Sequence, residues 1–302
     1  MNPILALIIA NIIWGAASPI FKLSLQNIPP FTLAFIRFIF AAILLIPFII
    51  HKWQKLTFRQ YFEIIVASFF GISVNISFFF LALPKTASIN APIIASASPI
   101  ILFFLSILFL KERFRMNVFR GILISFLGVL IIIFSPLLMD GALSIEAKET
   151  AFEGNLFLVV ATFGSVMHAL IFKKVLKSVW HIQASFISFF VGSASFIPFM
   201  IPELSRWSFA LLDYRGWVGI IFGVFLSSAL AYALYIYGIS KIHAQEIGIF
   251  TYIDPVIAVV LAIPLLGEYP SLPFFAGSLL VFLGIVFAEG RLHWHPVHRI
   301  KG

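Results

Sequence analysis

Residues 98–112 read SPIILFFLSILFLKE, and residues 254–268 read DPVIAVVLAIPLLGE. A shift of 156 positions lays one stretch over the other, with Pro on Pro near the start and Glu on Glu at the end. Apolar sequences match easily by chance, but Pro, Gly and charged residues that coincide in one register are better evidence for a repeat. The same shift superimposes Lys85 on Lys241, Gly121 on Gly277, and the triplet Phe-Leu-Gly at 126–128 on 282–284.

A second pair of stretches supports the repeat at a slightly different shift. FIRFIFAAILLIP at 35–47 lies over FISFFVGSASFIP at 186–198 when the shift is 151, and Pro47 then falls on Pro198. The two halves of the chain are therefore predicted to have the same arrangement of elements.

The composition indicates that these elements cross a membrane. The chain has 302 residues, of which 62% are hydrophobic and 11% are charged, whereas soluble domains carry roughly 25% charged residues. A membrane-spanning helix needs about 20 apolar residues, so the chain can hold roughly ten such helices. We predict an all-α polytopic protein with ten transmembrane helices near 3–23, 30–50, 61–83, 87–110, 117–137, 154–175, 182–201, 215–238, 245–266 and 271–289.

Five helices in each repeat fix the relation between the two halves. Because five is odd, the second repeat enters the membrane from the opposite side, which is the inverted-repeat plan of many secondary transporters. The predicted division is a first repeat at 1–137, an external acidic linker at 138–153, a second repeat at 154–290 and a cytoplasmic basic and His-containing tail at 291–302.

Basic residues gather in the loops on one side of this predicted topology. The positive-inside rule then places both termini in the cytoplasm, and we expect a multi-pass protein of a bacterial-type inner (plasma) membrane. The basic residues on the cytoplasmic side include Lys52, Lys55, Arg59, Lys111, Arg113, Arg115, Arg120, Lys173, Lys174, Lys177, Arg291, Arg299 and Lys301.

Several short motifs follow one another along the predicted spans: Trp14-Gly15 in the first span, FIRF around Arg37 in the second, KER at 111–113 after the fourth and LGE at 266–268 at the matching place in the second half. Together they resemble the EamA-like family of the drug/metabolite transporter superfamily. The resemblance covers the whole chain. It implies a ten-helix, exporter-like carrier of amino acids or other small metabolites with a central cavity.

Other chemistries lack their sequence signatures. The chain contains no HExxH, no Gly-rich phosphate loop and no cysteine, so we expect no metal, no cofactor and no enzyme activity. The formal net charge is +8, but the basic residues follow the loops, so no nucleic-acid partner is expected. Without a phosphate loop, transport would draw on an ion or substrate gradient.

Two charged residues lie within predicted spans, where charge is costly. Arg37 either reaches the external interface or pairs structurally, or else it faces the cavity and binds an anionic group such as a substrate carboxylate. Its repeat equivalent is Ser188, so the charge belongs to one half only. Asp254 lies over Ser98 and is equally asymmetric. It is either a hydrogen-bonded structural residue or a carboxylate that takes a proton or a substrate ammonium.

Further polar and aromatic side chains are candidates for the cavity. His168 is either a group that hydrogen-bonds two helices or, because imidazole titrates near neutral pH, a group for proton coupling. Single amides and rings suit an amphipathic small molecule, although packing alone would also explain each of them. The predicted substrate-binding residues are Trp14, Arg37, Asn75, Phe79, His168, Tyr235, Tyr252 and Asp254.

The expected function is secondary-active transport, with export of amino acids or similar metabolites by alternating access. Prolines remove helix hydrogen bonds, and Pro19, Pro99 and Pro255 are the predicted hinges. A passive facilitator or channel is the nearer alternative, and an integral-membrane enzyme acting on a lipid-linked substrate is the more distant one. The stripe Ala87, Ala91 and Ala95 permits close helix packing, within the monomer or in a homodimer.

Overall fold

The structure is a computed structural model that describes residues 2–50, 52–96, 98, 101, 104–105, 116–138, 144–239, 250 and 253–289. Every regular element within those residues is a helix. Their bounds are α1 Pro3–Ser24, α2 Pro30–Ile49, α3 Phe58–Ser68, η1 Phe69–Val74, α4 Asn75–Ala82, α5 Asn90–Ala95, α7 Met116–Leu138, α8 Ile145–Val175, α9 His181–Leu204, η2 Phe209–Leu211, α10 Tyr214–Ile221, η3 Phe222–Leu230, α11 Ala231–Ile239, α13 Ile253–Leu266 and α14 Leu272–Glu289.

Seven helices in these residues are long and apolar enough to cross a membrane. Two of them are composite: α3, η1 and α4 run together as Phe58–Ala82, and α10, η3 and most of α11 as Tyr214–Tyr235. The helices α13 and α14 are apolar but shorter. The protein is therefore built as a multi-pass integral membrane protein, as predicted.

Local sequence explains where several helices begin. Asn2 accepts a hydrogen bond from the amide of Ile4 at the start of α1, and Pro3 follows where a missing N–H costs nothing. Thr57 and Gln60 form a capping box at α3. Ser144 caps α8 through the amide of Ala147, so the helix begins well before the predicted start at 154. The C-terminal part of the acidic segment 138–153 is therefore a helical extension rather than a loop.

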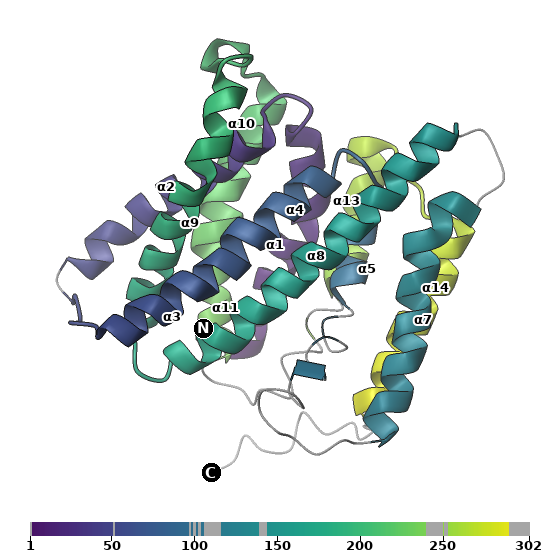
Figure 1. The fold of residues 1–302 in the computed structure, drawn as a ribbon, viewed down its shortest axis with the longest axis horizontal. Helices are drawn as coiled ribbons and strands as arrows, with labels where there is room; N and C mark the ends of the chain where they lie inside the picture. The colour runs from purple at the N-terminus through teal and green to yellow at the C-terminus, as the bar shows by residue number, and fades with distance from the viewer. Residues whose placement is uncertain are drawn as a thin grey trace.

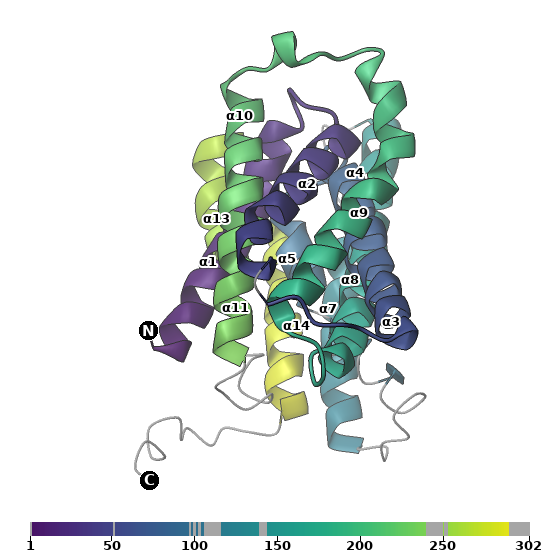
Figure 2. The same cartoon turned by 90° about the vertical axis from the view of Figure 1, so that its left-hand side faces the viewer.

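Two pairs of packed helices flank the molecule (Figures 1 and 2). α2 packs against α9 on one side of the molecule, and α7 packs against α14 on the other. Between these pairs, α1 contacts α11 and α13, while α8 runs along α3, η1 and α4. Each of the two flanking pairs joins two spans that the sequence shifts of 151 and 156 residues align with one another.

The α7–α14 contact is made by glycines. A Cβ built on Gly128 would lie 2.5 Å from the carbonyl oxygen of Gly277, and one on Gly284 would lie 2.4 Å from that of Gly121. Such distances leave no room for a side chain, so the two backbones approach as closely as small residues allow. These four glycines are the two pairs that coincide in the sequence repeat.

Two segments have π-helical hydrogen bonding, η1 in the first half and η3 in the second. The shift of 156 residues carries 69–74 onto 225–230, the C-terminal part of η3. Single π-turns within α-helices are rare and frequently occur at functional sites. Because η1 and η3 lie at positions that this shift aligns, the side chains around both segments are candidates for a functional site.

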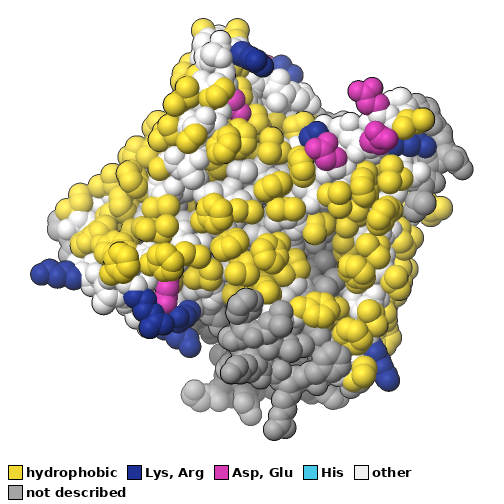
Figure 3. Space-filling model, viewed as in Figure 1, with side chains coloured by type: hydrophobic (Ala, Val, Ile, Leu, Met, Phe, Trp, Pro, Cys, Tyr) yellow, Lys and Arg dark blue, Asp and Glu magenta, His cyan; other side chains and the backbone are white. Residues whose placement is uncertain are grey.

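The outer surface separates apolar from charged side chains. Figure 3 shows hydrophobic side chains spread across the middle of this face, with most of the Lys, Arg, Asp and Glu side chains towards its upper and lower edges. Large apolar residues such as Phe48, Phe190 and Phe287 are more than half exposed. A lipid environment accounts for this exposure, because lipid chains solvate apolar side chains.

Candidate functional site

Arg37 lies in the protein core between α2 and η3. The residue is only 4% exposed to solvent. Nε donates a hydrogen bond to the Oγ of Ser228 and Nη2 donates one to the Oγ of Ser227, both at 2.9 Å. The guanidinium also lies over the rings of Phe21 and Phe38, 4.9 and 4.7 Å from their centroids. Within the described residues, no carboxylate forms an ion pair with it.

Trp14 connects α1 to the same π-helical segment. Its indole Nε1 donates a hydrogen bond to the main-chain oxygen of Ser227 at 3.1 Å. Its ring lies 4.9 Å from Tyr235 and 5.4 Å from Tyr232. Tyr232 in turn interacts electrostatically with Arg37. These aromatic side chains and the guanidinium form one continuous group, which we call the Arg37 cluster: Trp14, Arg37, Ser227, Ser228, Tyr232 and Tyr235.

Asp254 lies beside this cluster, in the first turn of α13. Gly15 of α1 makes room for it, because a Cβ on Gly15 would be 2.8 Å from both the Cα and the carbonyl oxygen of Asp254. The carboxylate interacts electrostatically with Tyr235, and its buried Oδ1 has no hydrogen-bond partner among the described residues. Of the predicted site residues, the structure thus brings together Trp14, Arg37, Tyr235 and Asp254.

Asn75 and His168 lie apart from Arg37, where α8 packs on the third span. Nδ2 of Asn75 donates to the carbonyl of Ala161 at 2.7 Å. Nδ1 of His168 is 2.9 Å from the carbonyl of Ala67, and the ring stacks on Phe172 at 4.7 Å. These contacts join helices, which is the first of the two roles considered for His168.

The remaining predicted residues are placed as follows. Phe79 packs between the two groups, 6.5 Å from Phe21 and 5.8 Å from Phe80. Pro19 lies inside α1, and Pro255 lies in the first turn of the described part of α13. Tyr252 and Pro99 fall outside the described residues.

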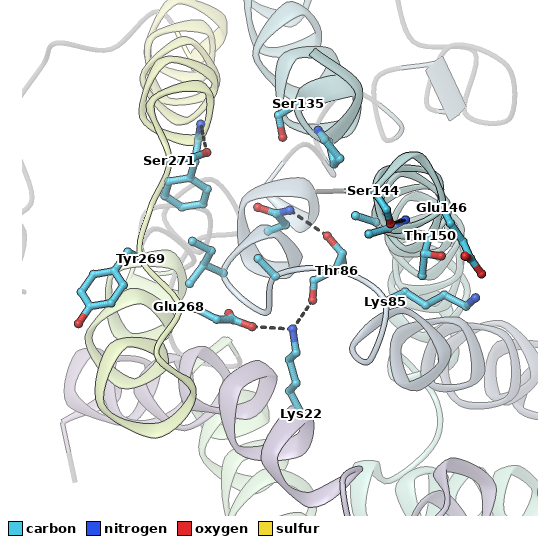
Figure 4. A pocket seen from close by; sticks show the side chains of 17 residues that line it. Lys22, Lys85, Thr86, Ser135, Ser144, Glu146, Thr150, Glu268, Tyr269 and Ser271 are labelled. Atoms are coloured by element: carbon cyan, nitrogen blue, oxygen red, sulfur yellow. Dashed lines mark hydrogen bonds and ion pairs between the residues drawn. The ribbon is translucent and has the colours of Figure 1, made fainter. Parts of the chain in front are cut away.

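A pocket of about 710 Å³ opens at the C-terminal end of α1 (Figure 4). Nζ of Lys22 points into it and lies 2.6 Å from both Oε1 of Glu268 and the carbonyl oxygen of Thr86. The second oxygen of Glu268 accepts hydrogen bonds from the amide and hydroxyl of Ser88, both at 2.7 Å. Glu268 therefore ties the ends of α1 and α13 to the segment before α5.

A buried amide network supports one side of this pocket. Asn155 is fully buried, and its Oδ1 accepts hydrogen bonds from Thr86 Oγ1 at 2.7 Å and Asn90 Nδ2 at 3.0 Å. Its Nδ2 donates to the carbonyls of Ile132 and Ile133. Because every polar atom of this side chain has a partner, it can hold α5, α7 and α8 together in the core.

Sequence reasoning missed Ser227, Ser228 and Tyr232, as well as the polar pocket. The pair of serines in an otherwise apolar span was visible in the sequence. Nothing in the pattern showed that they would face Arg37, because a π-helical segment changes which residues share a face. A helical period of 3.6 residues therefore misplaces side chains beyond such a segment.

Comparison with known proteins agrees with this architecture. The model of the EamA-like transporter family matches residues 1–134 and 152–289. A protein described as the uncharacterized transporter YetK of Bacillus subtilis is 29% identical over 291 residues, covering 94% of this chain and 86% of that protein. An uncharacterized transporter of Archaeoglobus fulgidus is 23% identical, covering 96% of this chain and 98% of its own length.

A solved crystal structure has the same fold. It matches with a TM-score of 0.64 and covers 95% of both chains at 16% sequence identity. The family match spans nearly the whole chain in two segments that correspond to its two halves. The chain belongs to the EamA-like transporter family.

Proposed function

We propose that this membrane transporter is a secondary-active carrier that exports amino acids or similar small metabolites by alternating access. The Arg37 cluster is the proposed substrate site. It combines one permanent positive charge with aromatic rings, and such a site suits a small molecule with a carboxylate and an apolar part.

The observation that carries the proposal is the uncompensated charge of Arg37. A buried guanidinium normally pairs with an acid, because an unpaired charge in the protein interior is unfavourable. Here the described partners are two neutral hydroxyls and two aromatic faces. An anionic substrate group would supply the missing negative charge, and the planar guanidinium can bind a carboxylate through two parallel hydrogen bonds.

The proposed mechanism rests on ten helices in two inverted five-helix repeats. The equivalent positions of η1 and η3, and the packing of α2 on α9 and of α7 on α14, support this plan. Two similar halves can exchange conformations, which gives inward-open and outward-open states of similar energy around a central site. Pro19, Pro99 and Pro255 remain the proposed hinges, and a homodimer remains a proposal.

The charge distribution supports an orientation as well. With both termini in the cytoplasm of a bacterial-type cell, the protein would lie in the inner membrane. The pocket around Lys22 and Glu268 would then face outside, because it lies at the C-terminal end of α1.

Purified protein in liposomes tests the carrier function. Liposomes loaded with an unlabelled amino acid should accumulate the labelled form by counterflow, and uptake should saturate. A facilitator with a continuous pore would show flux without counterflow. A membrane enzyme acting on a lipid-linked substrate would move none of a broad metabolite panel and would accumulate a lipid product. Either result would contradict the carrier proposal.

A further inference from the structure

The face of α1 towards α13 carries buried oxygens that lack partners. Asn11, Gly15 and Ser18 are spaced by four and three residues, so they share one face of the helix. Asn11 is 1% exposed and Ser18 is 3% exposed. Within the described part of the chain, Oδ1 of Asn11 and Oγ of Ser18 have no hydrogen-bond partner, and neither has Oδ1 of Asp254 on α13.

A backbone oxygen adds to this group. Pro19 has no N–H, so the carbonyl of Gly15 lacks its usual intrahelical hydrogen bond. Gly15 is the residue that meets the backbone of Asp254. The contact therefore combines the Asp254 carboxylate of α13 with three groups at neighbouring levels of α1: an amide oxygen, a hydroxyl and a carbonyl that lacks its usual amide donor.

Two of these oxygens cannot hydrogen-bond to each other. Oδ1 of Asn11 is a carbonyl oxygen and therefore only an acceptor, and the one hydrogen bond found for Nδ2 of the same side chain goes to the carbonyl of Leu7 at 2.8 Å. An ionised Asp254 is likewise an acceptor only. Buried polar atoms in native proteins almost always have a partner, so an unpartnered group needs a specific explanation such as a bound ion.

Among the described residues, no Lys, Arg or His forms an ion pair with Asp254, and Arg37 in the neighbouring cluster donates its hydrogen bonds to Ser227 and Ser228 instead. Tyr235 from α11 interacts with the carboxylate and is neutral in its ordinary state. The nearest basic residue along α1 is Lys22, which is already bound to Glu268 at the end of the helix. The described residues of α5, which also packs on α13, contain no titratable side chain.

We propose that the α1–α13 contact binds a single monovalent cation, either a proton or Na⁺, at Asp254 together with Asn11, Gly15 and Ser18. Oxygen ligands of this kind suit a hard cation, and transporters commonly bind their coupling ion where a helix is interrupted. The inference rests on the proposed carrier function. It adds that the energy for transport comes from a cation gradient acting on α1 and α13.

Thermal unfolding of the purified wild-type protein tests binding without transport. One series replaces choline chloride by NaCl at constant ionic strength, and a second lowers the pH from 8.5 to 5.5 without Na⁺. A cation that binds only the folded protein raises Tm in a saturable way. A rise with Na⁺ identifies Na⁺ as the ion, and a rise only at lower pH identifies the proton.

Variants assign the response to the proposed residues. Asp254→Asn should abolish it, while Asn11→Leu and Ser18→Ala should shift the midpoint at least about tenfold towards higher Na⁺ or proton concentration. The last two keep every charge and serve if Asp254→Asn does not fold. Glu153→Gln removes a carboxylate that pairs with Lys85 on the surface and should respond as the wild type does.

Three results would overturn the proposal. The first is the absence of any effect of Na⁺ or pH, and the second is a full response in Asp254→Asn. The third is a shift caused only by an ammonium-bearing substrate, which would make this contact part of the substrate site. Counterflow that persists without any cation effect would refute the cation site alone. A cation-dependent Tm in a protein that moves no substrate would refute the carrier function alone.

Discussion

Ser125 on α7 donates a hydrogen bond to the main-chain oxygen of Val281 on α14, at 3.0 Å. These two residues are 156 positions apart, so each is the equivalent of the other in the sequence repeat. Equivalent residues meet only near an axis that relates two halves, as in an isologous contact. This hydrogen bond therefore supports a pseudo-twofold axis between α7 and α14, as two inverted repeats require.

Replacing a glycine at this contact should weaken the protein. Gly277→Leu would drive a side chain against Ile132 and the backbone of Gly128, and overpacking of this kind typically costs about 1–3 kcal/mol. We expect a lower Tm in detergent and broader size-exclusion peaks. Leu127→Ala on the partner helix α7 changes a residue that is 56% exposed and should leave Tm unchanged. A Gly277→Leu protein as stable as the wild type would contradict the close approach of the two helices.

Lys22 and Glu268 should separate during transport if the outer ends of α1 and α13 open. The chain contains no cysteine, so a Lys22→Cys, Glu268→Cys double variant can be joined selectively with a short, reducible bifunctional thiol reagent. Transport should stop on crosslinking and return after reduction, as measured by counterflow in liposomes. Each single variant treated with the same reagent is the control. Full transport by the crosslinked protein would show that this ion pair need not open.

Arg37 should set the preference for a carboxylate. Arg37→Gln removes the charge, and charge-assisted hydrogen bonds contribute about 1.5–3 kcal/mol, so KM for a carboxylate substrate should rise roughly tenfold or more. Arg37→Lys keeps the charge but loses the planar pair of donors. Its KM for the carboxylate substrate should therefore lie between that of the wild type and that of Arg37→Gln. For an amide analogue of the substrate, KM should change much less in these variants than it does for the acid.

The matched control for Arg37 is Arg59→Gln. Arg59 pairs with Glu63 one turn away, and its side chain is 77% exposed, so this change should leave both substrates unaffected. Equal losses for acid and amide in Arg37→Gln would indicate that Arg37 is a structural residue.

Arg37 shows most clearly which features of the candidate site could be predicted from the sequence. Its position within a span and the serine at the equivalent place, Ser188, were both predictable. In the structure Ser188 accepts a hydrogen bond from Ser68 at 2.9 Å, whereas Arg37 binds Ser227 and Ser228. Ser188 therefore faces the composite span Phe58–Ala82 of the first half, and Arg37 faces the composite span Tyr214–Tyr235 of the second half. Which residues of that span they meet depends on η1 and η3, and hydrophobic periodicity carries no signal for a π-helical segment.

The fold was more predictable than the site, because a run of about 20 apolar residues is enough to identify most membrane spans. The predicted boundaries at 3–23, 30–50, 117–137 and 182–201 agree with α1, α2, α7 and α9 to within a few residues. The pocket around Lys22 could not be predicted, because it assembles residues from helix ends and loops that are far apart in the sequence. Charged residues at span ends look alike in sequence whether they face lipid headgroups or one another.

His168 should matter for packing and not for coupling. Its Nδ1 contacts the carbonyl of Ala67, and a Cβ on Gly71 would lie 2.3 Å from its ring. The ring therefore fills the space between α8 and η1. His168→Asn places an amide where Nδ1 lies but removes the packed ring, so Tm should fall while the pH dependence of transport stays close to that of the wild type. His168→Phe keeps the stacking on Phe172 but loses the hydrogen bond, which should cost about 0.5–1.5 kcal/mol. If His168→Asn transported normally at one pH but lost the pH dependence, the imidazole would be the proton-coupling group, and Asp254 would not be the site of a coupling proton.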